Sequence, residues 1–297
     1  MHPVSLESFT KKYKTLLEER LRDAVGSLET PENLAKAMLY SLEAGGKRIR
    51  PLLVFAVIDA FGKDPIHGLD AAAAIEMVHT YSLIHDDLPS MDDDDLRRGK
   101  PTNHNVFGEA TAILAGDALL TLSFSMLADM PEEAALATVK FSLIKGLSVA
   151  AGAAGMVGGQ IADMEGEHKQ LTLEQLEYIH LHKTGKLLEY SIIAGAEIAG
   201  ANEVQKKMLA KFAYHLGLAF QIRDDILDLE GTEEMIGKPI GSDAMNEKST
   251  YPALLGLEGA KKALQDHLIL AKDTLNSMGL QVDVLSQITD LIGLRNY

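Results

Sequence analysis

Acidic side chains crowd two short stretches of this chain. Six aspartates fall within ten residues, from Asp86 to Asp95. A second group, Asp224, Asp225 and Asp228, lies in the apolar segment FQIRDDILDLEG, where Asp224 and Asp228 are one helical turn apart. Like charges at such spacing repel, so each group needs either solvent and salt around it or bound cations. Apolar flanks make water alone a poor explanation for the second group.

Bound divalent cations would neutralise the repulsion within both aspartate groups. Asp86 and Asp87 end the helical segment TYSLIHDD, and Asp92 follows six residues after Asp86. Magnesium prefers oxygen ligands and is typically held by one or two carboxylates plus the phosphates of a substrate. Two aspartate groups that face each other across a helical bundle would form a diphosphate clamp around Mg²⁺. For the first group alone, a solvated loop is the alternative.

Basic residues bracket the first aspartate group. Guanidinium groups bind phosphate oxygens in bidentate fashion, so these residues point to a second anion site that needs no metal. Taken singly, Arg48 and Lys100 fit an ordinary surface position. The residues are Lys47, Arg48 and Arg50 in GGKRIRP, and Arg97, Arg98 and Lys100 in LRRGK.

Helices must position these groups, because hydrophobic periodicity is helical nearly throughout. Helix start signals recur, among them Thr30-Pro31-Glu32 and a capping box formed by Thr172 and Gln175. The sequence predicts an all-α chain of about ten to thirteen helices. Two polar segments, 88–104 and 231–250, resist the helical interpretation. No composition shift marks a boundary, so residues 1–297 are expected to form a single domain.

Composition limits the function classes. Of the 297 residues, 46% are hydrophobic and 24% are charged, so the chain can bury a large core. A net charge of −15 argues against nonspecific nucleic-acid binding, which needs a basic surface. No cysteine is present, so any metal site must use oxygen or imidazole ligands, and a reducing, cytoplasmic location fits.

Membrane association is not expected from this sequence. The first twenty residues form an amphipathic rather than an apolar segment, so no secretion signal is predicted. The most apolar later segments are ATAILAGDALLTLSFSML, which Asp117 interrupts, and LSVAAGAAGMVGG, which is built from small residues. Both fall short of a membrane span and are expected to be buried helices, with the glycines of the second allowing close helix packing.

Seven motifs in order resemble the isoprenyl diphosphate synthases, the trans-prenyltransferases, and within them the bacterial members that make farnesyl diphosphate. The resemblance covers essentially the whole chain. It implies an all-α, single-domain antiparallel bundle around a deep central cavity, with two aspartate-rich motifs on opposite walls, and a homodimer. The motifs are GGKRIRP, EMVHTYSLIHDDLPSMDDDDLRRGKPTNH, GGQIADM, HKTGKL, GLAFQIRDDILD, GKPIGSD and KSTYPALLG.

The resemblance also implies roles for individual residues. The metal ligands, for three Mg²⁺ ions that chelate an allylic diphosphate, would be Asp86, Asp87, Asp92, Asp224, Asp225 and Asp228. The same diphosphate would be contacted by Arg97, Lys183, Lys238 and Lys248, and isopentenyl diphosphate would be held by Lys47, Arg50, His79 and Arg98. The reacting carbons would be lined by Thr184 and Gln221, with Gln160 and Asp163 in support.

The implied reaction condenses isopentenyl diphosphate with dimethylallyl and geranyl diphosphate to give farnesyl diphosphate by ionisation, attack and proton loss. Tyr81, five residues before Asp86, would be the floor that stops elongation near fifteen carbons. Alternatives are a twenty-carbon geranylgeranyl diphosphate synthase and a noncatalytic partner subunit, although both aspartate groups are present. A terpene cyclase would not need the basic site. His168, His180 and His182 are expected to be surface or capping residues.

Overall fold

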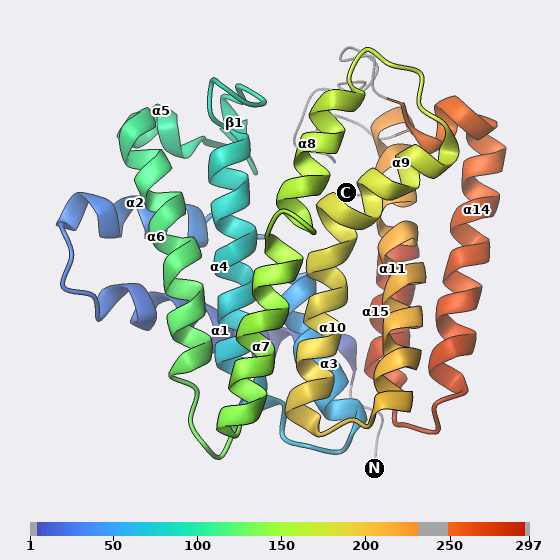
Figure 1. Ribbon diagram of the computed structural model, residues 1–297, viewed down its shortest axis with the longest axis horizontal. Coiled ribbons are helices and arrows are strands. Elements are labelled where there is room, and N and C mark those ends of the chain that lie inside the picture. Colours follow the sequence, from blue (N-terminus) through green and yellow to red (C-terminus); the bar gives the residue numbers. More distant parts are fainter. Residues whose placement is uncertain (1–4, 231–248, 295–297) are drawn as a thin grey trace.

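The computed structural model describes residues 5–230 and 249–294 (Figure 1). The described part is an all-α fold with thirteen α-helices, which confirms the predicted class. Its elements are α1 (Leu6–Gly26), α2 (Glu32–Leu42), α3 (Ile49–Ala60), η1 (Pro65–Gly68), α4 (Leu69–Asp86), β1 (Leu96–Arg97), β2 (Lys100–Pro101), α5 (Asn103–Phe107), α6 (Glu109–Ala128), α7 (Ala137–Ala151), α8 (Met156–Gly166), α9 (Leu173–Ile179), η2 (His180–Gly185), α10 (Lys186–Ala199), α11 (Glu203–Glu230), α14 (Tyr251–Asn276) and α15 (Asp283–Leu294).

Local signals position several of these elements. Helix α2 begins at Glu32, directly after Pro31, and α9 begins after a capping box in which Thr172 and Gln175 exchange hydrogen bonds. The polar segment 88–104 is largely non-helical and contains the antiparallel hairpin of β1 and β2. Most of the other polar segment, 231–250, lies outside the described residues.

Helices α3 and α4 form the centre of the core. Ten of the twelve residues of α3 are buried, and α4 is buried on almost every side, including the run from Ala71 to Ala74. A helix that is apolar all round is stable only inside a protein. Small alanine side chains let neighbouring helices approach α4 closely, and α4 packs along α6 while α3 packs along α10. The one acidic side chain buried in α4 is Glu76.

The two aspartate-bearing helices end at the same end of the bundle. Helices α4 and α11 both run toward the end that carries the β1 hairpin and α9, so Asp86 and Asp224 are delivered to one rim (Figure 1). Helix α14 packs along α11 and begins beside Asp225. The fold therefore brings together groups that lie far apart in the sequence.

Helices α6 and α7 are not buried as expected. Leu114 on α6 is 58% exposed, and Val149 on α7, which lies in the segment LSVAAGAAGMVGG, is 52% exposed. By length and composition alone, the stretches Glu109–Ala128 and Ala137–Gly166 could each cross a membrane. In the bundle, 39% of the most apolar part of the first stretch is buried, and 33% of that of the second. Two such helices are weak evidence for a membrane span, because core helices of soluble proteins can be equally long and apolar. Some apolar residues of α6 and α7 that were predicted to lie in the core therefore lie on an outer face of the bundle.

A pair of histidines joins α11 to α14. His215 Nδ1 lies 3.1 Å from His267 Nδ1. Burial and the nearby His267 and Lys211 lower the pKa of His215 to about 4, and burial also lowers the pKa of His267. The unfolded chain, in which histidine titrates near 6.5, therefore takes up protons that the folded chain does not.

We expect the free energy of unfolding to fall as the pH drops from about 6.5 toward 4. Both histidines are partly exposed, so solvent screening limits the loss to about 1 kcal/mol. Urea denaturation at pH 7.5 and pH 5 should show a smaller loss in His215→Gln than in the wild type. His67→Gln, outside this contact, is the control. An identical pH dependence in His215→Gln would contradict the assignment.

Candidate active site

A tight turn after α4 brings the first aspartate group together. The backbone N–H of Asp92 donates to the carbonyl of Asp86 at 2.9 Å, and the N–H of Met91 donates to Leu88 O at 2.8 Å. Asp86 is half-buried at the end of the helix, whereas Asp92 is exposed. The turn therefore places two of the predicted metal ligands side by side at the rim.

Asp87, the third predicted ligand of this group, is turned inward. Its side chain is buried, and its Oδ1 accepts hydrogen bonds from Arg97 Nε, at 2.8 Å, and from Arg97 Nη2. Asp94 accepts a third hydrogen bond from Arg97 at 3.0 Å. The structure thus joins Asp87 to Arg97, a residue predicted to contact the diphosphate. Such bidentate contacts fix the direction of the guanidinium group.

The second aspartate group divides as helical periodicity predicts. Asp224 and Asp228 lie on one half-exposed face of α11, while Asp225 is buried on another. Asp225 Oδ2 accepts the backbone N–H of Tyr251 at 2.9 Å and lies 3.2 Å from His180 Nε2. Tyr251 is the first residue of α14, so the carboxylate satisfies one of the unpaired N–H groups at that helix end.

His180 is therefore not the surface or capping residue that was expected. Its side chain is mostly buried, and its contact partner is one of the predicted metal ligands. Its position before the motif HKTGKL was the only sequence signal. His182 matches the expectation better, because its Nδ1 is 2.7 Å from the carbonyl of Tyr178 in its own helix.

These carboxylates fit magnesium of the substrate-bridged kind. Among the described residues, no set of three or more histidine, aspartate or glutamate side chains is arranged to enclose a metal ion by itself. Burial raises the pKa of Asp86 to about 6; Lys183 opposes this shift, and the neighbouring Asp92 adds to it. The raised pKa reflects the cost of burying an ionised carboxyl group. Oxygen donors that gather at one rim but do not enclose an ion by themselves suit cations that substrate phosphates help to hold.

Lys183 and Thr184 are carried by an unusual turn. Residues His180–Gly185 form a π-helical turn between α9 and α10, a feature that is often found at functional sites. Lys183 Nζ donates to Asp163 on α8 at 2.6 Å, which supports the expected role of Asp163. Helix α8 approaches this turn closely because of Gly159, where a Cβ atom would lie 2.1 Å from the backbone nitrogen of Lys183.

Three cavities meet around these residues. A cavity of about 490 Å³, here called the apolar cavity, and a cavity of about 530 Å³, here called the basic cavity, share Arg50 and His79 in their linings. A smaller cavity of about 140 Å³ shares Lys183 and Thr184 with the apolar cavity and includes Gln221. Lys47, Arg50, His79, Arg98, Lys183, Thr184 and Gln221 therefore line cavities that share wall residues with one another.

The basic cavity contains the predicted isopentenyl diphosphate residues. Lys47, Arg50, His79 and Arg98 all line it. His79 is half-buried, and desolvation together with the neighbouring Arg50 and Arg98 lowers its pKa well below the usual value, so the imidazole is neutral. A neutral imidazole can still donate one N–H to a phosphate oxygen without the cost of a buried charge.

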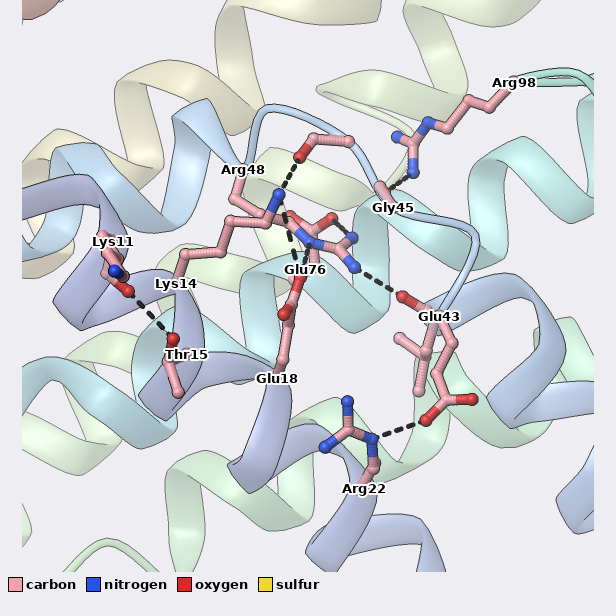
Figure 2. Close-up of polar contacts among 12 residues, drawn as sticks. Lys11, Lys14, Thr15, Glu18, Arg22, Glu43, Gly45, Arg48, Glu76 and Arg98 are labelled. Atoms are coloured by element: carbon pink, nitrogen blue, oxygen red, sulfur yellow. Dashed lines mark hydrogen bonds and ion pairs between the residues drawn. The ribbon is translucent and has the colours of Figure 1, made fainter. Parts of the chain in front are cut away.

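Arg48, expected to be an ordinary surface residue when taken singly, is buried. Its Nη1 pairs with Glu76 of α4, and its Nη2 donates to the carbonyl of Leu42 at 2.5 Å (Figure 2). The backbone φ of Arg48 is 54°, which lies in the left-handed region that residues other than glycine rarely adopt. Glu76 was not among the predicted site residues, although a lone acidic residue within an apolar stretch of a helix indicates a buried partner.

Tyr81 on α4 lines the apolar cavity. Its side chain is only 6% exposed, and its ring meets the edge of His85 at 5.7 Å between centroids. The apolar residues Ile113, Met156 and Val157 complete this part of the lining. Lys238 and Lys248, also predicted to contact a diphosphate, lie outside the described residues.

Comparison with known proteins agrees with this geometry. The polyprenyl synthetase family model matches residues 31–282. The chain is 58% identical to the farnesyl diphosphate synthase of Geobacillus stearothermophilus over the full length of both proteins. It is 55% identical to that of Bacillus subtilis (strain 168), covering 98% of this chain and 99% of the relative. A crystal structure of an FPP/GFPP synthase from Zymomonas mobilis superimposes with a TM-score of 0.86 at 37% identity, covering 97% of this chain and 98% of the other.

Proposed function

The chain belongs to the polyprenyl synthetase family, and we propose that it is a farnesyl diphosphate synthase. It is a prenyltransferase that condenses isopentenyl diphosphate with dimethylallyl and then geranyl diphosphate. The observation that carries this conclusion is the arrangement of the cavities: a carboxylate rim, a basic cavity and an apolar cavity that share lining residues, with Tyr81 in the wall of the apolar cavity. A diphosphate fits the rim, and a prenyl chain fits the apolar cavity.

The allylic substrate would bind at the carboxylate rim. Asp86 and Asp92 on one side and Asp224 and Asp228 on the other are the ligands that we expect to hold Mg²⁺, three ions in all, together with the diphosphate. Bound Mg²⁺ would stabilise the negative charge that develops on the leaving diphosphate. Arg97, held by Asp87, and Lys183, held by Asp163, would orient the same diphosphate. Because Asp225 already binds Tyr251 N, we expect its main contribution to be structural.

The second substrate would keep its diphosphate in the basic cavity. Lys47, Arg50 and Arg98 can neutralise it, and neutral His79 can donate a hydrogen bond to it. Only the C–O bond of the allylic substrate breaks, because only that bond leaves a delocalised cation. The isopentenyl double bond then attacks the allylic cation, and loss of a proton restores a double bond. The released pyrophosphate is the proposed proton acceptor. Thr184 and Gln221, which line the smaller cavity beside Lys183 and Asp225, are the residues that we expect next to the reacting carbons.

A direct assay tests the proposed function. The purified protein is incubated with dimethylallyl and isopentenyl diphosphates, with and without Mg²⁺, and products are resolved by mass. A fifteen-carbon product that requires Mg²⁺ is expected. A twenty-carbon product would favour the geranylgeranyl alternative and remove Tyr81 as the floor. Absence of any product would favour a noncatalytic partner subunit.

We further propose that the protein is a homodimer in the cytoplasm. The support for the dimer is the outer face of α6 and α7, where Leu114, Phe141 and Val149 are each more than half exposed. A second copy would remove this apolar surface from water.

A dimer predicts a solution mass of twice 32.2 kDa. In analytical ultracentrifugation, Phe141→Glu should lower the measured mass toward that of the monomer, because the introduced carboxylate would be buried at the contact between the two copies. Val204→Glu, at another strongly exposed apolar position on α11, is the matched control and should leave the mass unchanged. A monomeric wild type would contradict the proposal.

A further inference from the structure

The segment between α2 and α3 is held by cations that bind its backbone carbonyls. Arg48 donates to Leu42 O, Arg98 donates to Gly45 O, and Lys14 of α1 donates to Gly46 O at 3.1 Å. Figure 2 shows Lys14, Arg48 and Arg98 converging on this loop. We call residues 43–48 the basic loop, because it carries Lys47 and leads into Arg50. Two carbonyls of the basic loop, those of Gly45 and Gly46, are thus bound by side chains from other parts of the chain. Arg48, which belongs to the loop, binds the carbonyl of Leu42 at the end of α2.

The basic loop has little rigidity of its own. Gly45 and Gly46 have φ values of 89° and 124°, which side-chain-bearing residues rarely adopt. A Cβ atom at Gly46 would lie 2.8 Å from the Arg98 guanidinium carbon, so the glycine also leaves room for that group. Glycines lose more backbone entropy on folding than other residues, so an ordered double glycine requires outside contacts.

Helix α1 supplies such contacts from one stripe. Lys14, Glu18 and Arg22 follow one another at four-residue spacing, so they share a helix face. Lys14 binds Gly46 O and lies 3.9 Å from Glu18, Glu18 lies 4.0 Å from Arg48 Nε, and Arg22 Nε donates to Glu43 at 2.6 Å. Every member of the stripe therefore contacts the basic loop or its buried arginine (Figure 2).

We propose that Lys14 is a positioning residue for the diphosphate bound in the basic cavity. It does not line that cavity, so it acts through the loop that presents Lys47 and Arg50. Loss of the Lys14 contact lets the Gly45-Gly46 backbone move, and Lys47 must then be ordered when the ligand binds. The carboxylate rim lies on other elements and is unaffected. The inference rests on the proposed function for the identity of the ligand.

The test is Lys14→Met, compared with Lys14→Arg and Lys11→Met. Lys14 is partly exposed, so the substitution is compatible with folding. We expect the KM for isopentenyl diphosphate to rise about 3- to 10-fold, as for loss of one partly exposed charged hydrogen bond, with kcat and the KM for geranyl diphosphate little changed. Lys14→Arg keeps a donor and should restore most of the affinity.

Lys11→Met tests whether the effect of Lys14→Met depends on the position of the lysine or only on the loss of its charge. It removes the same charge from the same helix three residues away, but Lys11 has no contact with the basic loop among the described interactions (Figure 2). Equal KM changes in Lys11→Met and Lys14→Met would overturn the proposal in favour of a general electrostatic effect, and so would an unchanged KM in Lys14→Met.

Calorimetric titration of the metal-free protein with isopentenyl diphosphate makes the test independent of turnover. If the wild type makes no product in the assay with Mg²⁺ and both substrates but binds isopentenyl diphosphate in the titration, and Lys14→Met binds it several-fold more weakly, the proposed function fails and the positioning role stands. If the wild type turns over normally and Lys14→Met binds the ligand as tightly as the wild type, the positioning role alone fails.

Discussion

Replacing Asp86 or Asp224 with asparagine should lower kcat by at least about 1,000-fold while the protein stays folded. Each substitution keeps the side-chain volume but removes a charge that would hold Mg²⁺ against the leaving diphosphate. Because the positive charge stabilises the transition state more than the bound substrate, the loss should fall on kcat more than on KM.

Stability should respond in the opposite direction. Burial raises the pKa of the Asp86 carboxyl, so its ionised form destabilises the metal-free fold at neutral pH. The melting temperature of metal-free Asp86→Asn should therefore equal or exceed that of the wild type. This separates an active-site effect from misfolding.

Asp93→Asn is the matched control for the acidic run. Asp93 is exposed, and its φ of 51° is one that asparagine tolerates. It should retain near-normal kcat at saturating Mg²⁺, measured by product formation from geranyl and isopentenyl diphosphates. Near-normal turnover in Asp86→Asn or Asp224→Asn would remove the two aspartate groups from the mechanism.

Removing the ring of Tyr81 should lengthen the product. The ring is almost fully buried against His85 at the cavity wall, so Tyr81→Ala extends the space available to the growing chain. We expect the ratio of twenty-carbon to fifteen-carbon product to rise at least about tenfold, which corresponds to a change of about 1.4 kcal/mol in the competition between release and another condensation. The measurement is mass analysis of products at equal conversion.

Tyr81→Phe is the control for this change. It keeps the ring and removes only the hydroxyl, so the product should remain fifteen carbons long. Truncation of a buried aromatic ring also costs stability, and a thermal melt should show that Tyr81→Ala remains folded at the assay temperature. An unchanged product distribution in folded Tyr81→Ala would place the floor on other residues of the apolar cavity.

Much of the fold could be predicted because its signals are local. Helical periodicity, the proline before α2 and the capping box of α9 depend on neighbouring residues, and all of them hold in the structure. The expectation that α6 would be buried was wrong, because composition reports how apolar a helix is and not which neighbour covers each face. Leu114 satisfies the same pattern as a core leucine yet lies on the outside.

The sequence alone determined the fold class, the two aspartate groups, the basic groups and the family to which their order belongs. Tertiary structure decided the partner of each buried charge. Asp87 pairs with Arg97, Asp225 accepts a hydrogen bond from the first residue of α14, and Arg48 pairs with Glu76. The physical reason is that a buried charge must find a partner, and that partner is set by which helices pack together rather than by distance along the chain. The contact of Lys14 with Gly46, across 32 residues and through a left-handed turn, has no periodic signature at all.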